Sequence, residues 1–423
     1  MTLITRIGGE TGVAAGLRRG LRDADWLTPD RAKAYARLWL AVGVVVTLAW
    51  AALAKGGLDL MGKPLGSDFV SFWTASQMAL GGHAAEVYQS THRAAEARLF
   101  GRDVGDYAFF YPPIFLLVCL PLAGLPYLAS LAAWLAATGV AYAKVVRGFL
   151  GQAGREGRIG WVAILAFPGV LSNVGHGQNA FLSAALFGGG VQLLDRRPYL
   201  AGVLLGCLAY KPQIGLIIPL ALLAAGRWRS IAGAASAVAG LVAASVWAFG
   251  LASWRGFLAA SPLARAALEQ NLIGYEKLQS VFAAVRLMHG GVGLAYVAQG
   301  VAATAICGCL VWGQRRAFRH EAEGPAMVVA ALLVSPFLLD YDLVLLAIPL
   351  AWLTAEGLRN GFLPWEKLVL AAGFLLPAVS RTIAGRIGVP IGPVVVTAVF
   401  WLVLRRWVSA DPGRQSFKRS VGF

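Results

Sequence analysis

The sequence predicts an all-α protein that crosses a membrane many times, and three observations support this prediction. Of the 423 residues, 58% are hydrophobic and only 14% are charged, whereas a soluble domain averages about 25% charged residues. Long apolar runs recur between residues 37 and 404. Backbone groups in lipid must bond within helices or closed barrels, and the sequence lacks the alternating segments of about ten residues that are typical of a barrel.

The net charge of +16 indicates a membrane surface, and not nucleic acid, as the partner. The basic residues stand in short clusters between apolar runs, as in cytoplasmic loops that contact anionic lipids. The four cysteines lie inside apolar runs, without the spacing of a zinc site or a disulfide framework. We therefore expect membrane lipids as partners, no nucleic acid, no metal and no cofactor.

The first part of the chain sets the predicted orientation in the inner membrane of the cell. Residues 1–36 are rich in arginine and contain no long apolar core, so they form a cytoplasmic segment and not a cleavable signal peptide. The first span covers residues 37–54, and residues 55–112 then lie outside. A transmembrane catalytic domain is expected over residues 37–405, followed by a cytoplasmic tail at 406–423.

Alternation of the basic clusters predicts about twelve crossings, with both termini in the cytoplasm. Residues 113–146 are interrupted by Pro121 and Pro126 and cross either once or twice, and one crossing agrees better with the charge rule. Several apolar arms fall short of the ~20 residues that a full span needs. We expect these arms to be broken or re-entrant helices that line a cavity.

This topology gathers the polar residues near the membrane on its outer face, while the inner face carries mainly basic clusters. Polar and ionisable groups at membrane depth are costly, so they indicate function by default. The gathered residues are Asp68, Tyr111, His176, Gln178, Asn179, Lys211, Gln213, Asp340, Tyr341 and Asp342.

The stretch SDFVSFWTASQMALGG opens this group of residues. Ser67 or Asp68 could cap a helix over residues 69–80, and taken alone this is the favoured interpretation. The aromatic residues and Gln77 recur on one face, as in a helix that lies in the membrane interface. A second such helix is expected at about 84–99.

Two further motifs place polar residues beside the membrane. In YAFFYPPIFLL, Tyr111 fits either an aromatic belt at the interface or the wall of a site for a lipid chain or sugar ring. In SNVGHGQNAF, His176 and Gln178 stand between glycines, where they are either simply solvated or in contact with a sugar or phosphate. A metal site would need further ligands nearby, and no paired-histidine spacing is present.

Lys211 interrupts a largely apolar stretch, LAYKPQIGL. A lysine at the centre of a membrane helix costs ~2.5–3.5 kcal/mol, unless its side chain reaches the interface. The adjoining Pro212 and Gln213 favour a real break in the helix. A fixed ammonium group at such a break is suited to binding a phosphate.

The motif SPFLLDYDLVLLAIP places Asp340 and Asp342 on either side of Tyr341 at a helix junction. One interpretation is an ordinary acidic turn. The functional ones are binding of an acceptor hydroxyl, a second base, or an ion-pair partner for Lys211. Both acids adjoin long apolar runs, which favours function.

The quoted motifs stand in a fixed order together with FYPPIFLLVCLPLAGLP and LDRRPYLAGVLLGCLAYKPQIGL, from about residue 66 to 350. In this order they resemble glycosyltransferase family 87, which includes polyprenol-phosphate-mannose-dependent mannosyltransferases. The resemblance implies a GT-C membrane fold and a sugar donor carried on a polyprenyl monophosphate. It also implies transfer to a lipid or glycan acceptor on the extracytoplasmic side, with a catalytic acid in the first outer loop, which Asp68 matches.

The sequence departs from the mannosyltransferase branch at one place. That branch resembles Asp-His-His where this chain has Asp340-Tyr341-Asp342. The roles of those histidines, and mannose as the sugar, are therefore not carried over.

The resemblance and the residues together predict a mechanism. Asp68 acts as the base that removes the acceptor's proton in an inverting displacement. Lys211 binds the donor phosphate as a fixed positive charge, with Arg265 and Arg286 as further candidates. The sugar hydroxyls are oriented by Tyr111, His176, Gln178, Asn179, Gln213, Asp340, Tyr341 and Asp342.

The alternative function is a transporter or flippase of lipid-linked sugars, because broken helices with polar groups also occur in transporters. The sequence shows no convincing internal repeat, and a transporter does not need a long outer loop with interfacial helices. A structural subunit of an envelope-assembly complex is a third option, and the one-sided polar groups argue against it.

Overall fold

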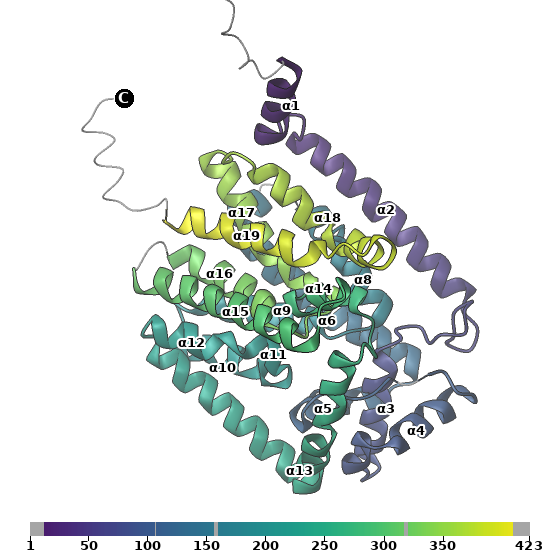
Figure 1. The fold of residues 1–423 in the computed structure, drawn as a ribbon. Helices are drawn as coiled ribbons and strands as arrows, with labels where there is room; N and C mark the ends of the chain where they lie inside the picture. The colour runs from purple at the N-terminus through teal and green to yellow at the C-terminus, as the bar shows by residue number, and fades with distance from the viewer. Residues whose placement is uncertain (1–11, 106, 156–159, 317–319, 409–423) are drawn as a thin grey trace, which may run out of the picture.

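The protein is helical throughout the part of the chain that the computed structural model describes (Figure 1). That part comprises residues 12–105, 107–155, 160–316 and 320–408. Within it there is no strand, and the β-bridges join only single residues. The predicted all-α class is therefore confirmed. Residues 1–11 and 409–423, which belong to the two predicted cytoplasmic segments, lie outside the described residues.

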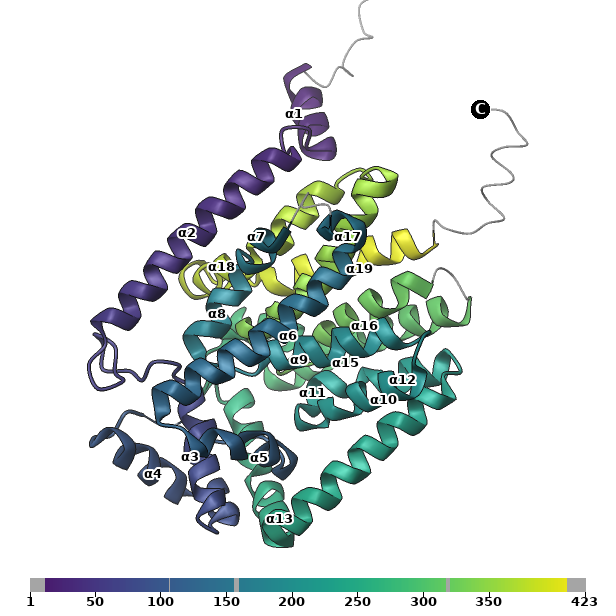
Figure 2. The ribbon, with the colours of Figure 1, turned by 180° about the vertical axis from the view of Figure 1, so that it is seen from behind.

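The long helices include α2 and α13, which run diagonally along two edges of the molecule in both views (Figures 1 and 2). The long helices are α2 (Pro29–Leu53), α6 (Tyr127–Arg155), α13 (Trp228–Glu269), α15 (Val292–Arg315), α18 (Glu366–Ile387) and α19 (Ile391–Val408). The shorter α-helices lie between and beside them. They are α1 (Gly12–Asp23), α3 (Phe69–Leu80), α4 (Ser90–Phe100), α5 (Pro113–Cys119), α7 (Gly160–Leu165), α8 (Pro168–His176), α9 (Ala180–Leu193), α10 (Pro198–Gly206), α11 (Pro212–Gly215), α12 (Ile217–Ala224), α14 (Val281–Leu287), α16 (His320–Val334) and α17 (Ala347–Asn360). The 3-10 helices are η1 (Ala84–Tyr88), η2 (Leu120–Gly124), η3 (Cys207–Tyr210), η4 (Tyr275–Lys277) and η5 (Asp340–Leu346).

Seven helical segments of the described chain are long and apolar enough to cross a membrane. They are α2, α6, α13, η5 with α17, α15, α18 and α19. A polytopic membrane protein is therefore what the structure supports, and the count of about twelve crossings stays a prediction. Four shorter apolar segments, at 113–124, 180–193, 198–210 and 212–224, correspond to arms that the sequence predicted to be too short for a span.

The prolines of the 113–146 region divide it unevenly. α5 and η2 end before Pro126, and the long α6 begins at Tyr127. Of these segments only α6 reaches the length of a span. One crossing here, the option that the charge pattern favoured, stays a prediction.

The helix expected at residues 69–80 is present as α3, and the one expected at about 84–99 is divided into η1 and α4. The aromatic face of α3 is buried in protein. Phe69 and Phe72 are almost fully buried. The Phe72 ring packs edge-on against Phe115 and Trp134, with centroids 5.0 and 6.2 Å apart. The expectation that this face lies on lipid is wrong, because a stripe of aromatic residues fits α5 and α6 as well as it fits a membrane.

Charged residues join the ends of the helices on one side of the bundle. Arg227, which precedes α13, pairs with Glu323 at 2.5 Å and with Asp195 at 2.9 Å. Arg406 near the end of α19 pairs with Glu366 at the start of α18. The α1–α2 turn reaches the same end, because the Trp365 amide donates to the Arg22 carbonyl oxygen at 2.6 Å. The start of α2 and the end of α19 therefore lie on one side of the bundle, and their predicted place in the cytoplasm stays a prediction.

α10 packs against the first half of α13 through glycines. A Cβ added at Gly202 would lie 1.9 Å from the Ser230 carbonyl oxygen, and one at Gly206 would lie 2.5 Å from that of Ala234. Small residues four apart are the usual device for close approach of membrane helices. This contact fixes α10, and α10 leads through η3 directly to Lys211.

We predict that Gly202→Val lowers the midpoint of thermal unfolding in detergent, because the added side chain must push the two backbones apart. Overpacking of this kind typically costs about 1–3 kcal/mol, and more where backbone must move. The matched control is Gly240→Val on α13, where a Cβ would meet nothing within 4 Å. An equal loss of stability in both variants would contradict the close-packing account.

Candidate active site

Asp68 stands at the start of α3 but does not cap that helix. It occupies the N-cap position, and its side chain makes no capping hydrogen bond. The carboxylate instead accepts from Gln178 Nε2 at 2.9 Å and lies 3.3 Å from the Ser67 hydroxyl. The Asp68 amide donates to the carbonyl oxygen of His176 at 2.9 Å. The interpretation of Asp68 as a helix cap, which was favoured only when the motif was taken alone, is therefore wrong. The half-buried carboxylate remains open to a further partner.

A glycine turn brings Gln178 to Asp68, which is 110 residues away in sequence. Gly177 ends α8 with φ of 66°, and a Cβ there would lie 2.6 Å from Phe69 Cβ. Only glycine combines this left-handed conformation with so close an approach. Both turns, at Gly177 and at Gly66 with φ of 65°, hold the start of α3 against the end of α8.

The amide of Gln178 is oriented by two donors. Its Oε1 accepts from the Tyr111 hydroxyl at 3.2 Å and from the Asn179 amide at 3.0 Å. With its oxygen satisfied in this way, its Nε2 points to Asp68 as a donor. Tyr111, Gln178 and Asp68 thus form one chain of hydrogen bonds.

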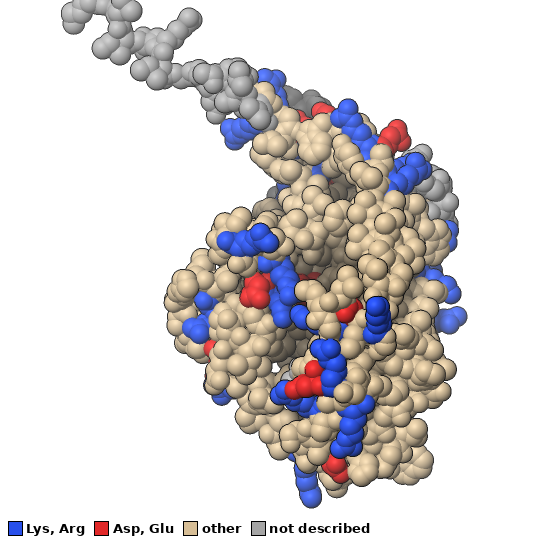
Figure 3. All heavy atoms as spheres, turned by 90° about the vertical axis from the view of Figure 1, so that its right-hand side faces the viewer, with Lys and Arg blue, Asp and Glu red and all other residues tan. Residues whose placement is uncertain are grey.

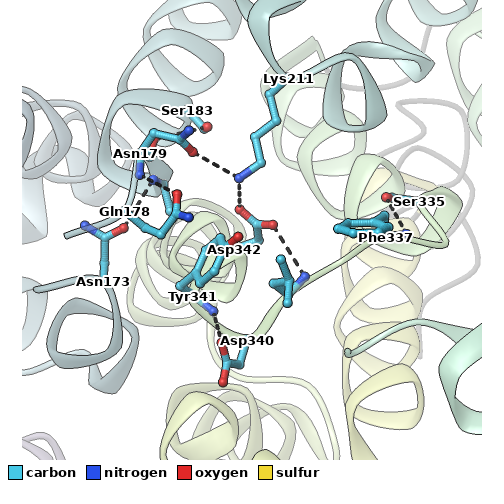
Figure 4. Close-up of polar contacts among 12 residues, drawn as sticks. Asn173, Gln178, Asn179, Ser183, Lys211, Ser335, Phe337, Asp340, Tyr341 and Asp342 are labelled. Carbon is cyan, nitrogen blue, oxygen red and sulfur yellow. Dashed lines mark hydrogen bonds and ion pairs between the residues drawn. The ribbon is translucent and has the colours of Figure 1, made fainter. Parts of the chain in front are cut away.

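Lys211 is fully buried in an ion pair with Asp342 (Figure 4). Their side chains are 1% and 0% exposed, and Lys211 Nζ lies 2.5 Å from Asp342 Oδ1. Nζ also donates to Asn179 Oδ1 at 3.1 Å. It stands 5.1 Å from the centre of the Tyr341 ring. Among the alternatives that the sequence left open for Asp342, the structure shows the ion-pair partner of Lys211.

Asp340 lies on the other side of Tyr341 and faces a different set of charges. Its Oδ1 accepts from the Tyr341 amide at 2.8 Å, and its Oδ2 lies 3.6 Å from Arg381 Nη1. The His176 ring stands 5.8 Å from the Tyr341 ring, with Nδ1 2.8 Å from the Ser172 carbonyl oxygen, and the His176 carbonyl oxygen accepts from the Asp68 amide. These contacts bring Asp68, His176, Asp340 and Arg381 together in one cluster.

Comparison with known families identifies the chain. The sequence model of glycosyltransferase family 87 matches residues 109–336, more than half of the protein. This chain belongs to glycosyltransferase family 87. No curated protein and no solved structure matches it.

Family membership makes the protein a membrane glycosyltransferase, with a sugar donor and an acceptor as its partners. The predicted family is confirmed, and enzyme activity is favoured over the transporter and structural alternatives. The matched region contains Tyr111, His176, Gln178 and Lys211. Asp68 precedes it, so the position of Asp68 in the site rests on the geometry described above.

Arg381 is the residue of this cluster that the sequence interpretation missed. It stands on the last part of α18, and its side chain is 45% exposed. The only signal in the sequence is an arginine within the apolar run GFLLPAVSRTIAG. Nothing in that run indicates the contact with Asp340, which arises from packing of α18 on η5.

Two of the predicted basic residues lie in a separate cluster of the glycosyltransferase. Arg265 is 72% exposed and pairs with Glu269 at 2.7 Å. Arg286 donates to the Tyr275 hydroxyl at 2.9 Å and to the Gly290 carbonyl oxygen at 2.7 Å. This cluster contacts the segment before Asp340 through the backbone, where the Gln279 amide donates to the Leu338 carbonyl oxygen at 2.7 Å, and through apolar packing of Leu339.

The remaining predicted residues are near Lys211. Asn179 is fully buried, and its Nδ2 lacks a hydrogen-bond partner within the described residues. Gln213 is half-buried on α11, and no side-chain hydrogen bond to it is present in that part of the chain. Over the same residues, no group of three or more His, Cys, Asp or Glu side chains forms a metal site.

We predict that Lys211→Met destabilises the enzyme strongly, because it leaves the Asp342 carboxylate buried without a partner. Breaking a buried pair from one side typically costs about 3–5 kcal/mol. The double variant Lys211→Met/Asp342→Leu removes both charges and should recover most of that loss. The measurement is the midpoint of thermal unfolding of the three purified proteins in one detergent.

The exposed pair Arg93–Asp103, at 2.6 Å, provides the control. Arg93→Met should change the unfolding midpoint little, since exposed ion pairs contribute little. A double variant at Lys211 and Asp342 that is no more stable than Lys211→Met would contradict the pairing account.

Proposed function

We propose that this enzyme transfers a hexose from a polyprenyl-monophosphate donor to a lipid or glycan acceptor on the extracytoplasmic side of the inner membrane. The reaction is an inverting single displacement with Asp68 as the base. The observation that supports this proposal most directly is the geometry of Asp68. Its carboxylate is held by Gln178 and Ser67, is half-exposed, and belongs to the same cluster as His176, Asp340 and Arg381.

The base must accept a proton from an acceptor hydroxyl as that hydroxyl attacks the sugar. A carboxylate within hydrogen-bond reach can contribute about 10²–10⁴-fold in rate. Asp68 meets the requirement because its two present partners are donors, so its charge is not cancelled by a paired cation. Asp342 does not meet it, since it is fully buried and paired with Lys211.

The departing phosphate needs positive charge where negative charge develops. We propose Arg381 as its contact, because the guanidinium is half-exposed and lies beside the cluster that holds Asp68. Lys211 remains a candidate through its charge, although it would have to leave Asp342 to touch the phosphate. Arg265 and Arg286 remain candidates only if the donor extends toward their separate cluster.

The sugar would be oriented by the half-buried residues of the site. Tyr111 and His176 are accessible enough to contact a hydroxyl. Gln178, Asn179 and Asp342 are buried and engaged with one another and with Lys211, so we propose that they hold the site in shape. Gln213, Asp340 and Tyr341 stay candidates for direct contact. Mannose is one candidate hexose.

Asp68→Asn tests the base assignment. The amide keeps the size of the side chain but cannot accept a proton, so transfer should fall by about 10²–10⁴-fold. The assay is formation of labelled glycan in membrane vesicles supplied with a labelled polyprenyl-phosphate sugar. Asp103→Asn, which changes an exposed acid of the same outer segment, should leave the rate near the wild-type value. Full activity in the Asp68→Asn variant would contradict the assignment of Asp68 as the base.

Arg381→Gln tests the phosphate contact. Loss of a hydrogen bond to a charged group costs about 1.5–3 kcal/mol, so kcat/KM for the donor should fall roughly 10- to 100-fold. The acceptor KM should change little. Arg386→Gln, at an exposed position near the end of the same helix, is the control. A change confined to the acceptor KM would show that Arg381 acts on the other substrate.

A further inference from the structure

A cavity of about 580 Å³ lies between α2 and the body of the protein, and none of the candidate active-site residues lines it. Its walls come from the α1–α2 turn, α2, α7, α17 and α18. α2 runs along the edge of the molecule, with α18 and α7 beside it (Figures 1 and 2). Only 11% of its apolar window is buried, so the helix is held by few contacts along its length.

One end of this cavity is basic. Lys33 and Arg37 stand four residues apart on α2, and Lys367 lines the same cavity from the start of α18. Asp25 is the single acid in the wall, and it lies 3.3 Å from Lys367 Nζ. No partner is present for Lys33 or Arg37 among the described residues. The wall thus carries two more positive than negative charges.

Most of the remaining wall is apolar. Leu370, Phe374 and Leu375 continue along α18 from Lys367, and Val162 and Ala163 line the same cavity from α7. Seven residues of helix separate Lys367 from Phe374, which is about 10 Å at 1.5 Å per residue. The cavity therefore has cations at one end and about 10 Å of apolar wall beyond them. This arrangement suits a phospholipid, with its phosphate at the cations and the upper part of an acyl chain along the apolar wall.

Trp39 adds a polar contact to this wall. The residue lines the cavity, and its Nε1 is buried without a hydrogen-bond partner in the described part of the chain. A buried donor left without a partner typically costs about 1–3 kcal/mol. An ester or phosphate oxygen of a lipid would supply the acceptor.

The end of the bundle where α1 and α2 meet also carries charge. Figure 3 shows charged side chains spread over one face of the molecule, and its upper end carries several of them. The upper end is the side where α1 and α2 meet. It is the cytoplasmic side in the orientation proposed above, and the cytoplasmic leaflet is where anionic lipids attract basic residues.

We propose that this cavity binds one anionic phospholipid of the cytoplasmic leaflet, which fastens α2 to the body of the enzyme. The phosphate lies against Lys33, Arg37 and Lys367, and an acyl chain fills the apolar wall toward Phe374. The site is separate from the sugar-transfer site and holds a lipid that is not a substrate.

The test is native mass spectrometry of the purified full-length protein, after delipidation and titration with either phosphatidylglycerol or phosphatidylcholine in detergent. The wild type should retain one phosphatidylglycerol more tightly than phosphatidylcholine. Each basic residue near an anionic headgroup is worth about 1 kcal/mol, or about fivefold in affinity. Lys33→Gln/Arg37→Gln should therefore weaken phosphatidylglycerol binding by about 30-fold.

Two further variants keep the proposal falsifiable. Arg19→Gln/Lys144→Gln removes the same charges from positions outside the cavity wall and should leave binding unchanged. Ala371→Phe fills the apolar part without changing charge and should weaken both lipids. Equal binding of the two lipids by the wild type would overturn the proposal, as would equal losses in the two charge variants. Failure of these tests would leave the Asp68 and Arg381 predictions untouched, since those are measured by sugar transfer.

Discussion

The candidate active site depends on the buried ion pair between Lys211 and Asp342. Lys211 comes from the break between η3 and α11, and Asp342 comes from η5, 131 residues later. A charge in so buried a place is tolerated only when it is paired and hydrogen-bonded. Because Lys211 also bonds Asn179, the pair fixes the residue next to Gln178, which in turn holds Asp68. The half-exposed carboxylate is thus supported by a buried interior in which the charges of Lys211 and Asp342 cancel.

The fold class could be predicted from the sequence because a polytopic membrane protein is defined by composition and by long apolar runs. The surroundings of α3 could not be predicted in the same way. A stripe of aromatic residues indicates only that one face of a helix is shielded from water. Phe72 is shielded by packing against Phe115 and Trp134 and not by lipid. The number of crossings was equally hard to predict, since short apolar arms such as α10 and α12 reach the interior without having the length of a span.

The sequence predicted which residues form the candidate site better than it predicted what each of them does. Charge alternation alone placed Asp68, His176 and Asp340 on one face, and the structure brings them into one cluster. The same rule could not say that Lys211 would be neutralised by Asp342, because that pairing depends on which helices pack together. Arg381 was missed for the same reason: its importance comes from the contact of α18 with η5 and not from any pattern around it.

The central claim is that Asp68 drives a direct displacement of the phosphate by the acceptor hydroxyl. The most direct measurement is the anomeric configuration of the glycosidic bond, determined by NMR on the product formed from a donor of known configuration. The account predicts that the configuration at the transferred carbon is inverted. Retention of the donor's configuration would contradict it, because a single attack assisted by one base cannot give that product.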